Sequence, residues 1–233
     1  MDLDLILSSI GPLLSGTIRG TIPLTALSFV GGLIIAVGVA LARLSQIAVV
    51  RRLAQAYVSL IRGTPLLVQL FIIFYALPSL GLVIDPFPSA VIAFSLNVGG
   101  YASEVVRAAI LSIPRGQWEA AETIGYGRTL ALRRVILPQA ARVAVPPLSN
   151  TFISLVKDTS LASTIMVTEL LRKAQEIAAP TYEFLTLYSV AAVIYWVLCL
   201  VLSFGQTALE RRLGRHLAPA TAPRSKRTKA AVA

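Results

Sequence analysis

The sequence has very few of the side chains that carry enzyme chemistry. Its 233 residues include one cysteine, Cys199, and one histidine, His216. A single cysteine excludes a disulfide within the chain and a metal site built on cysteines. Cys199 lies in an apolar segment and His216 in a basic tail. The two therefore do not form the clustered nucleophile, base or metal site that an enzyme needs.

Lysine is also scarce, and its positions exclude another class of protein. None of the four lysines follows a glycine, so the Gly-x-x-x-x-Gly-Lys-Ser/Thr loop that cradles nucleotide phosphates is absent. Without that loop the chain cannot hydrolyse ATP by the usual P-loop route. If the chain takes part in ATP-driven work, a separate subunit must bind the ATP, and we expect no cofactor in this chain.

Charged residues are rare throughout the sequence. Only 14% of the residues are charged, against about 25% in ordinary soluble domains. With 56% hydrophobic residues and a mean hydropathy of +0.76, the chain is predicted to be an integral membrane protein. The net charge of +10 comes from basic residues between and after the apolar segments. It therefore indicates contact with membrane lipids, above all through the run Arg224 to Lys229, and no nucleic-acid partner.

The long apolar runs predict the fold. About 20 apolar residues cross a bilayer as a helix, and five segments qualify, so we predict an all-α membrane protein with a five-helix bundle. The bundle occupies residues 21–211, between an N-terminal periplasmic segment (1–20) and a basic cytoplasmic tail (212–233). Asp2 and Asp4 stand where a cleaved signal peptide would be basic, so the first apolar stretch should be kept. The predicted spans are 22–42, 57–77, 90–111, 139–167 and 184–204.

The basic residues between these spans predict the orientation. The loop after the first span and the loop 112–138 are rich in arginine. In contrast, the loop after the second span has Asp85 as its one charged residue, and the loop after the fourth span balances its basic residues with acids. By the positive-inside rule, the N-terminus lies outside and the C-terminus in the cytoplasm. The loop 112–138 then lies in the cytoplasm too.

That loop contains a short polar helix, predicted to end at Gly125 because glycine is the usual helix C-cap. The helix carries the triplet Glu119, Ala120 and Ala121, and the segment Ile136-Leu137-Pro138 follows it. Such a helix of about two turns is too short to be stable alone in water, and a partner protein could hold it. The alternative interpretation is a cytoplasmic loop with an incidental helical turn.

Three polar residues in the third predicted span are candidates for a substrate path. Asn97, Tyr101 and Glu104 are spaced four and then three residues apart, which places them on one helix face. A carboxylate inside a membrane span is costly and usually faces a partner or a cavity. Arg107 follows Glu104 at i+3, so a purely structural Glu104–Arg107 pair is the alternative.

The fourth predicted span adds three more candidates, Asn150, Lys157 and Asp158. Pro146 and Pro147 should break this helix, because each proline removes a backbone donor. Broken backbone at membrane depth is tolerated where it is packed or lines a cavity. Lys157 and Asp158 could then hold the two charges of a zwitterionic ligand. The alternative is a local kink stapled by a salt bridge.

These motifs together resemble those of ABC importer permeases of the polar amino-acid group, over residues 13–213. The Glu-Ala-Ala helix and Ile136-Leu137-Pro138 resemble the family's coupling loop. The segment Arg62-Gly63-Thr64-Pro65 recurs in the group, where it either anchors the second span or takes part in gating. Within the group the chain is most similar to L-cystine permeases, on segments 85–90, 115–121, 136–144, 146–150, 157–162 and 194–196.

The resemblance implies a type I importer subunit in the cell inner membrane, whose cytoplasmic coupling helix, with Glu119, Ala120, Ala121 and Gly125, docks on an ATPase. It also implies a second permease copy, as a homodimer or pseudo-dimer, and a periplasmic or lipid-anchored binding protein. L-cystine is the expected ligand; arginine, histidine, glutamine and glutamate remain alternatives, because their permeases share much of the pattern. An ion-coupled secondary transporter fits less well, because no internal repeat is evident.

Overall fold

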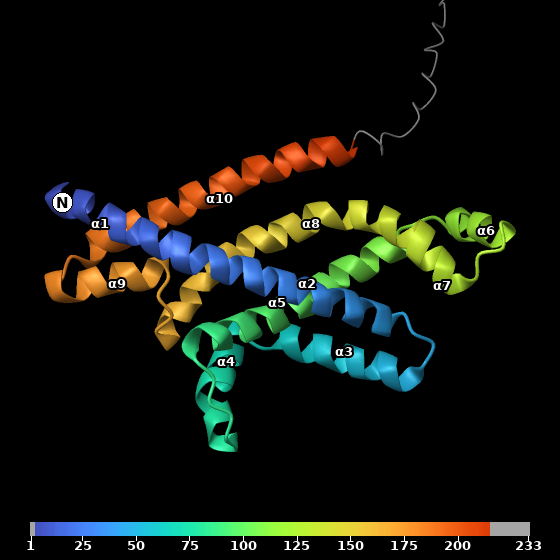
Figure 1. The fold of residues 1–233 in the computed structure, drawn as a ribbon, viewed down its shortest axis with the longest axis horizontal. Coiled ribbons are helices and arrows are strands. Elements are labelled where there is room, and N and C mark those ends of the chain that lie inside the picture. Colours follow the sequence, from blue (N-terminus) through green and yellow to red (C-terminus); the bar gives the residue numbers. More distant parts are fainter. Residues whose placement is uncertain (1–2, 215–233) are drawn as a thin grey trace, which may run out of the picture.

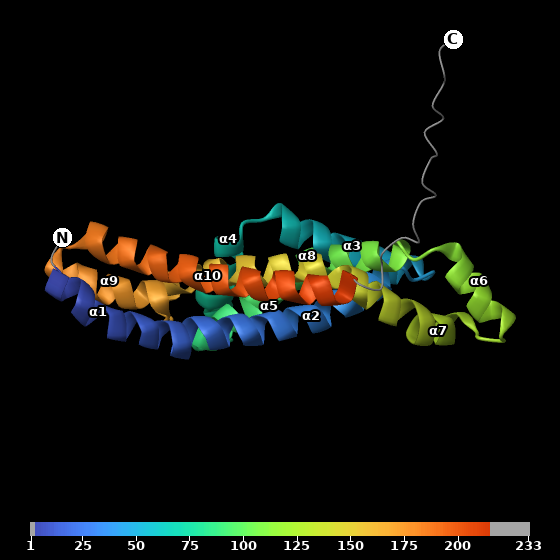
Figure 2. The same cartoon turned by 90° about the horizontal axis from the view of Figure 1, so that it is seen from above.

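A computed structural model describes residues 3–214, and this part of the chain is helical from end to end apart from short turns. Figure 1 shows an elongated bundle in which the long helices follow the long axis. The N-terminus and α9 (Leu170–Thr181) lie at one end, and α6 (Arg115–Thr123) and α7 (Arg128–Ala131) at the other. Figure 2 shows the same separation from above.

The first helix is longer than predicted. We expected residues 1–20 to precede the first span, but α1 (Leu3–Gly16) continues through a π-helical turn, η1 (Thr17–Thr21), into α2 (Ile22–Arg43). Together these elements form one candidate span of 41 residues. Tertiary packing explains the extension, because Leu13 of α1 is fully buried in a cluster with Leu170 of α9.

The second predicted span, 57–77, is not one straight helix. α3 (Ala48–Gly63) ends at an extended residue, Thr64, and α4 (Leu66–Phe71) starts after Pro65 at an angle of 107°. Proline pushes the residue before it out of the helical region, which fixes the bend here. The chain then passes through η2 (Ile72–Ala76) and η3 (Leu77–Leu80), and this arm leaves the bundle axis in Figure 1.

The core forms where α2 packs against α5 (Pro86–Leu111), which contains the third predicted span. Glycines let the two backbones approach closely: a Cβ on Gly32 would lie 2.5 Å from the Val98 side chain, and one on Gly99 would lie 2.5 Å from Ile35. Small residues permit this kind of contact in membrane bundles. Phe94 of α5 lies fully buried at the centre of the resulting cluster.

The prolines of the fourth predicted span do not break it. α7 and η4 (Leu132–Ile136) lead into α8 (Leu137–Asp158), which runs through Pro146 and Pro147 without interruption. The expected break was wrong: the fixed φ of proline lies in the helical range, so the helix continues past both prolines despite the lost donors and the clash with the carbonyls one turn back. The α-helix ends instead at Asp158, where it passes into a 3₁₀ turn, η5 (Thr159–Ile165).

The segment between the fourth and fifth predicted spans, which we described only as a loop, forms α9. Its N-cap is Glu169, a fully buried acid whose carboxylate accepts the Arg172 N–H at 2.6 Å and the Tyr195 hydroxyl at 2.6 Å. Burial raises the pKa of the Glu169 carboxyl, although these hydrogen bonds lower it in part. Tyr195 belongs to α10 (Phe184–Gly214), so the buried acid fastens α9 to the last helix.

The number of spans follows from length and composition. Within residues 3–214, three helices are long and apolar enough to cross a membrane: Leu3–Arg43, Pro86–Leu111 and Phe184–Arg212. The bent pair of α3 with α4 to η3 makes a fourth if it counts as one span. α8 is not among them, because its charged and amide side chains lower its hydropathy. The predicted basic tail, 212–233, lies almost wholly outside the described residues.

The π-helical turn of the first helix yields a stability test. Gly20 is buried against the start of α9, and a Cβ added to it would lie 2.2 Å from the Thr168 carbonyl oxygen and 2.7 Å from the Glu169 Cα. Backbone atoms cannot move aside cheaply, so we expect Gly20→Ala to destabilise the protein by about 2 kcal/mol. The thermal unfolding midpoint of the purified protein in detergent measures this.

Gly38→Ala is the matched control, because nothing lies within 4 Å of a Cβ at this exposed helical position. It should be neutral or stabilising, since alanine favours a helix over glycine. An unchanged midpoint for Gly20→Ala would contradict the close contact between the first helix and α9.

Candidate functional site

Four of the six predicted path residues line one cavity of about 500 Å³. It lies between α5, α8, η5 and the turn that joins α3 to α4. Asn97 and Tyr101 come from α5, and Asn150 and Asp158 come from α8. We call it the Asn97 cavity. Its complete lining is Thr64, Pro65, Leu66, Asn97, Val98, Tyr101, Asn150, Thr151, Ser154, Leu155, Asp158 and Leu161.

A residue that we had not singled out holds the wall of this cavity in place. The Gln69 Nε2 donates to the Ile61 carbonyl at 2.8 Å and to the Thr64 hydroxyl at 2.9 Å, so it ties α4 to the end of α3. Its Oε1 accepts a hydrogen bond from the Asn97 Nδ2 at 3.0 Å. The signal was available in the sequence, because Gln69 is a single amide in an apolar run just after the bend.

Lys157 does not join the cavity, although its neighbour Asp158 does. Lys157 is exposed, whereas Asp158 is half-buried. The rotation of α8 brings Asp158 to the cavity and leaves Lys157 outside its lining. Of the two charges that we expected this segment to offer a zwitterion, the structure therefore places only the negative one at the cavity. Asp158 is the one charged side chain in the described lining.

Glu104 lies in a neighbouring cavity of about 410 Å³ and has more partners than predicted. Arg107 is one, at 3.1 Å, but Arg43 of α2 and Arg62 of α3 (3.5 Å) also pair with the same carboxylate. Three guanidinium groups thus face one carboxylate. Sequence spacing could reveal only the local partner, because Arg43 comes from a distant helix. We call this the arginine cavity; Arg43, Gln55, Val58, Ser59, Arg62, Gly63, Tyr101 and Glu104 line it.

The two cavities share a wall. Tyr101 lines both of them, and the Arg62 guanidinium lies over its ring at 5.5 Å from the centroid. The chain segment at the α3–α4 bend also lies between them, since Arg62 and Gly63 line one cavity and Thr64 to Leu66 line the other. The bend that proline imposes therefore shapes both sites.

The short helix α6 has one packed side and one open side. Ala121 is buried and Trp118 packs against the cluster around Ile110 and Ile113, whereas Glu119 and Ala120 are exposed. Gly125 has a φ of +84°. Its N–H donates to the Glu122 carbonyl at 2.9 Å, and the Tyr126 N–H to the Ala121 carbonyl at 3.0 Å. This is the Schellman pattern of a helix that ends at a left-handed residue.

No group of three His, Cys, Asp or Glu side chains in residues 3–214 could hold a metal ion. What the described residues offer instead is a polar cavity with one carboxylate, a basic cavity beside it, and a capped surface helix at one end of the bundle.

Comparison with known proteins gives these features a context. Residues 13–215 match the family described as "Binding-protein-dependent transport system inner membrane component". The L-cystine transport system permease protein TcyB of Bacillus subtilis (strain 168) is 61% identical over 216 residues, which cover 92% of each chain. The glutamine transport system permease protein GlnP of Escherichia coli (strain K12) is 41% identical over 204 residues, or 87% of this chain and 93% of GlnP.

Solved structures share the architecture. The crystal structure of an amino acid ABC transporter with histidines superposes with a TM-score of 0.85 at 35% identity, and covers 91% of this chain and 99% of that chain. An inward-facing structure of the MetNI methionine ABC transporter superposes with a TM-score of 0.68 at 22% identity, covering 91% and 97%. The second likeness concerns the fold alone.

Proposed function

Because the chain belongs to the family of binding-protein-dependent transport system inner membrane components, we propose that it is the membrane subunit of an ATP-binding-cassette importer that moves L-cystine into the cytoplasm. The observation that carries this proposal is the extensive identity with TcyB across nearly the whole of both chains. The lower but substantial identity with GlnP keeps glutamine as a second candidate ligand. The chain itself is a permease, and a partner chain would hydrolyse the ATP.

The transport path would use the Asn97 cavity. It offers hydroxyl and amide groups for hydrogen bonds and the Asp158 carboxylate for an ammonium group. An amino acid needs such partners, because an unpaired charge inside a membrane costs several kcal/mol. L-cystine carries an ammonium and a carboxylate at each end, so it can meet this carboxylate with either half. Asn97, Tyr101 and Asn150 would position it.

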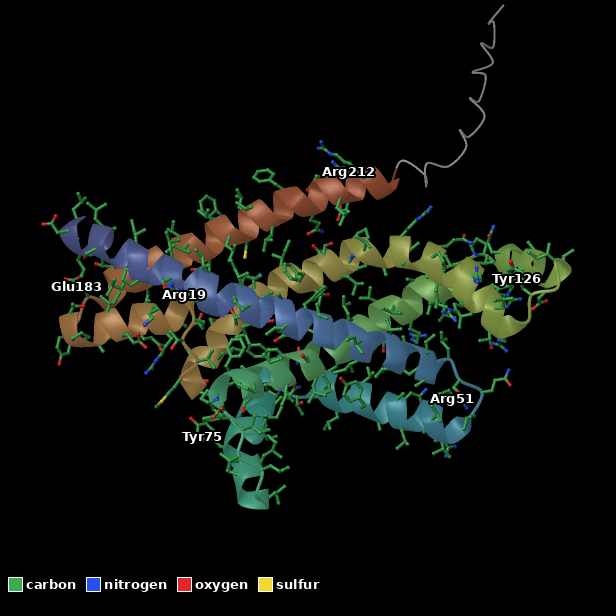
Figure 3. All side chains as sticks on the ribbon, in the orientation of Figure 1. Arg19, Arg51, Tyr75, Tyr126, Glu183 and Arg212 are labelled. Carbon is green, nitrogen blue, oxygen red and sulfur yellow. The ribbon has the colours of Figure 1, made fainter. Side chains whose placement is uncertain are left out.

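The proposed topology has five spans, with the N-terminus outside and the C-terminus in the cytoplasm. α8 would be the fourth span; Asn150, Thr151, Ser154 and Asp158 would be tolerated in it because they line a cavity. The distribution of charged loops between the two ends of the bundle supports this orientation. Figure 3 places Arg51, at the start of α3, and Tyr126, after α6, towards one end, and Glu183, before α10, at the other. The arginine-rich loops thus share an end, as positive-inside topology requires.

α6 would be the coupling helix that docks on the ATPase. Its exposed face carries Glu119 and Ala120, and its packed face rests on Ala121 and Trp118. α6 follows α5 after a turn at Ser112 to Pro114. A displacement of α6 would therefore act on α5, which carries Asn97, Tyr101 and Glu104. Alternating access needs such a link between ATP binding and the path.

The partners would be the ATPase, an amino-acid binding protein outside the membrane, and a second permease copy. The arm from α4 to η3 supports the second copy. Phe71, Ile72 and Tyr75 are exposed on it, as are Leu80 and Leu82. In the membrane this apolar arm meets lipid or another protein, and a paired subunit would pack against it because the arm leaves its own bundle. Two-fold pairing is the commonest symmetry among oligomers.

Uptake measurements test the ligand. We expect the permease, reconstituted in liposomes with its ATPase and binding protein, to import labelled L-cystine faster than arginine, histidine, glutamine or glutamate. Import should require ATP, because the chain belongs to an ATP-driven family. Glutamine or arginine import well above that of L-cystine would reject the cystine assignment alone. Import driven by an ion gradient in the absence of ATP would reject the importer itself.

Substitutions in α6 test the coupling role. We expect Gly125→Val to strain the left-handed cap by about 1–2 kcal/mol, and Glu119→Lys to reverse a charge on the exposed face. Both should lower substrate-stimulated ATPase activity, while the permease still inserts and folds. Gly127→Val is the matched control, because Gly127 has an ordinary φ of −65° and open space around it. If all three variants couple like the wild type, α6 is not the dock.

The mass of the purified complex tests the pairing. We expect the detergent-solubilised, active importer to contain two permease chains for each assembled complex. Native mass spectrometry or light scattering of the same sample used for uptake gives this number. An active complex with one permease chain, and no related second permease, would contradict the proposed pairing.

A further inference from the structure

The Asn97 cavity lacks a partner for half of its proposed ligand. Among its lining residues, Asp158 can pair with an ammonium group, but none carries a positive charge. A zwitterionic amino acid also has a carboxylate, which needs a cation or several donors when it leaves water. Lys157 was the expected cation and is exposed outside the cavity.

The arginine cavity has the opposite imbalance. Its lining holds Arg43 and Arg62 but only one carboxylate, that of Glu104, which leaves an excess of one positive charge. Arg107 also pairs with Glu104, from outside the lining. The Arg43 Nε is buried and has no hydrogen-bond partner within the part of the chain that the structure describes. Arg62 is the most accessible of the three, with 47% of its side chain exposed, against 15% for Arg43. The cavity can therefore accept a further anion, and Arg62 is best placed to contact it.

The surroundings of Arg62 indicate that this cavity faces water or a polar partner. On α3, Leu53 and Leu60 form an exposed apolar face, as expected towards lipid. Gln55, Ser59 and Arg62 form a separate exposed polar face that lines the cavity. Polar side chains in a membrane helix face a cavity or another protein, so the arginine cavity opens on the side of α3 away from its lipid-facing leucines.

We propose that the arginine cavity is the acceptor for the α-carboxylate of the transported amino acid, with Arg62 as the contact residue. The inference rests on the proposed function, because it assigns the two charges of the same substrate. The ammonium and carboxylate of one half of L-cystine are bonded to the same carbon and cannot lie on opposite sides of a wall, so the two halves divide the contacts. Asp158 takes the ammonium of one half in the Asn97 cavity, and Arg62 takes the α-carboxylate of the other half across the shared wall at Tyr101. Arginine suits this task, since its planar guanidinium binds a carboxylate with two parallel hydrogen bonds.

Two measurements test this inference: uptake by variants of Arg62, and thermal stabilisation by two ligands that differ only in the carboxylates. In liposomes containing the complete importer, Arg62→Gln should lower L-cystine uptake by about tenfold, because a charge-assisted hydrogen bond is lost. Arg62→Lys should give an intermediate uptake, because it keeps the charge but loses the bidentate geometry. Arg52→Gln is the matched control: Arg52 is an exposed cation on the same helix and lies outside the cavity lining.

A purely structural role for Arg62 would not change ligand preference, so the second measurement targets preference. The permease–ATPase complex in nanodiscs, without binding protein, is heated with L-cystine or with cystamine, its decarboxylated diamine. We expect L-cystine to raise the unfolding midpoint more than cystamine does in the wild type. Arg62→Gln should remove this difference, whereas Asp158→Asn should reduce stabilisation by both ligands.

The outcomes separate the inference from the function it rests on. Absence of amino-acid uptake by the wild type would overturn the proposed function. Normal uptake with Arg62→Gln equal to Arg52→Gln would overturn this inference alone. Equal stabilisation of the wild type by L-cystine and cystamine, or no stabilisation by either ligand, would also overturn this inference alone. An Arg62→Gln effect that vanishes in nanodiscs of neutral lipid would assign the cavity to a lipid phosphate and also overturn it.

Discussion

Close contact between the backbones of α2 and α5 is the constraint on which the rest of the structure depends. Gly32 and Gly99 leave no room for a side chain at their positions, so the two helices meet nearly backbone to backbone. This contact brings the end of α2 to the middle of α5 and places Arg43 beside Glu104. Three of the six candidate path residues lie on α5, so the packing that fixes α5 also fixes the two cavities.

The bend at Pro65, between α3 and α4, is the second feature that shapes the two cavities, after the contact between α2 and α5. Proline forces Thr64 into an extended conformation. Gln69 of α4 then holds the bend by donating to Ile61 and Thr64 at the end of α3 and by accepting from Asn97. The bend turns α4 away from the bundle and leaves a polar turn at the wall between the cavities.

Charge is divided between the cavities in a way that suits a zwitterion. One cavity carries Asp158 and the other an excess of arginine, with Tyr101 between them. α5 lines both and leads, after a short turn, to the capped helix α6. The same helix thus joins the proposed substrate path to the surface proposed to dock the ATPase, which would give a direct mechanical route between them.

The sequence by itself determined the membrane character, the helical class, the family, the short capped helix and most of the polar residues at the cavities, because apolar runs, breakers and residue spacing are local. It could not determine partners that come from distant helices. Arg43 and Arg62 meet Glu104 only because α2, α3 and α5 pack together, whereas spacing could reveal Arg107 alone. Local rules also misjudged Pro146 and Pro147, through which α8 continues, and the extension of the first helix to Leu3. Packing of α1 against α9 explains that extension. Which of two adjacent charges, Lys157 or Asp158, faces the cavity was likewise set by the rotation of α8 in the bundle, which only tertiary packing decides.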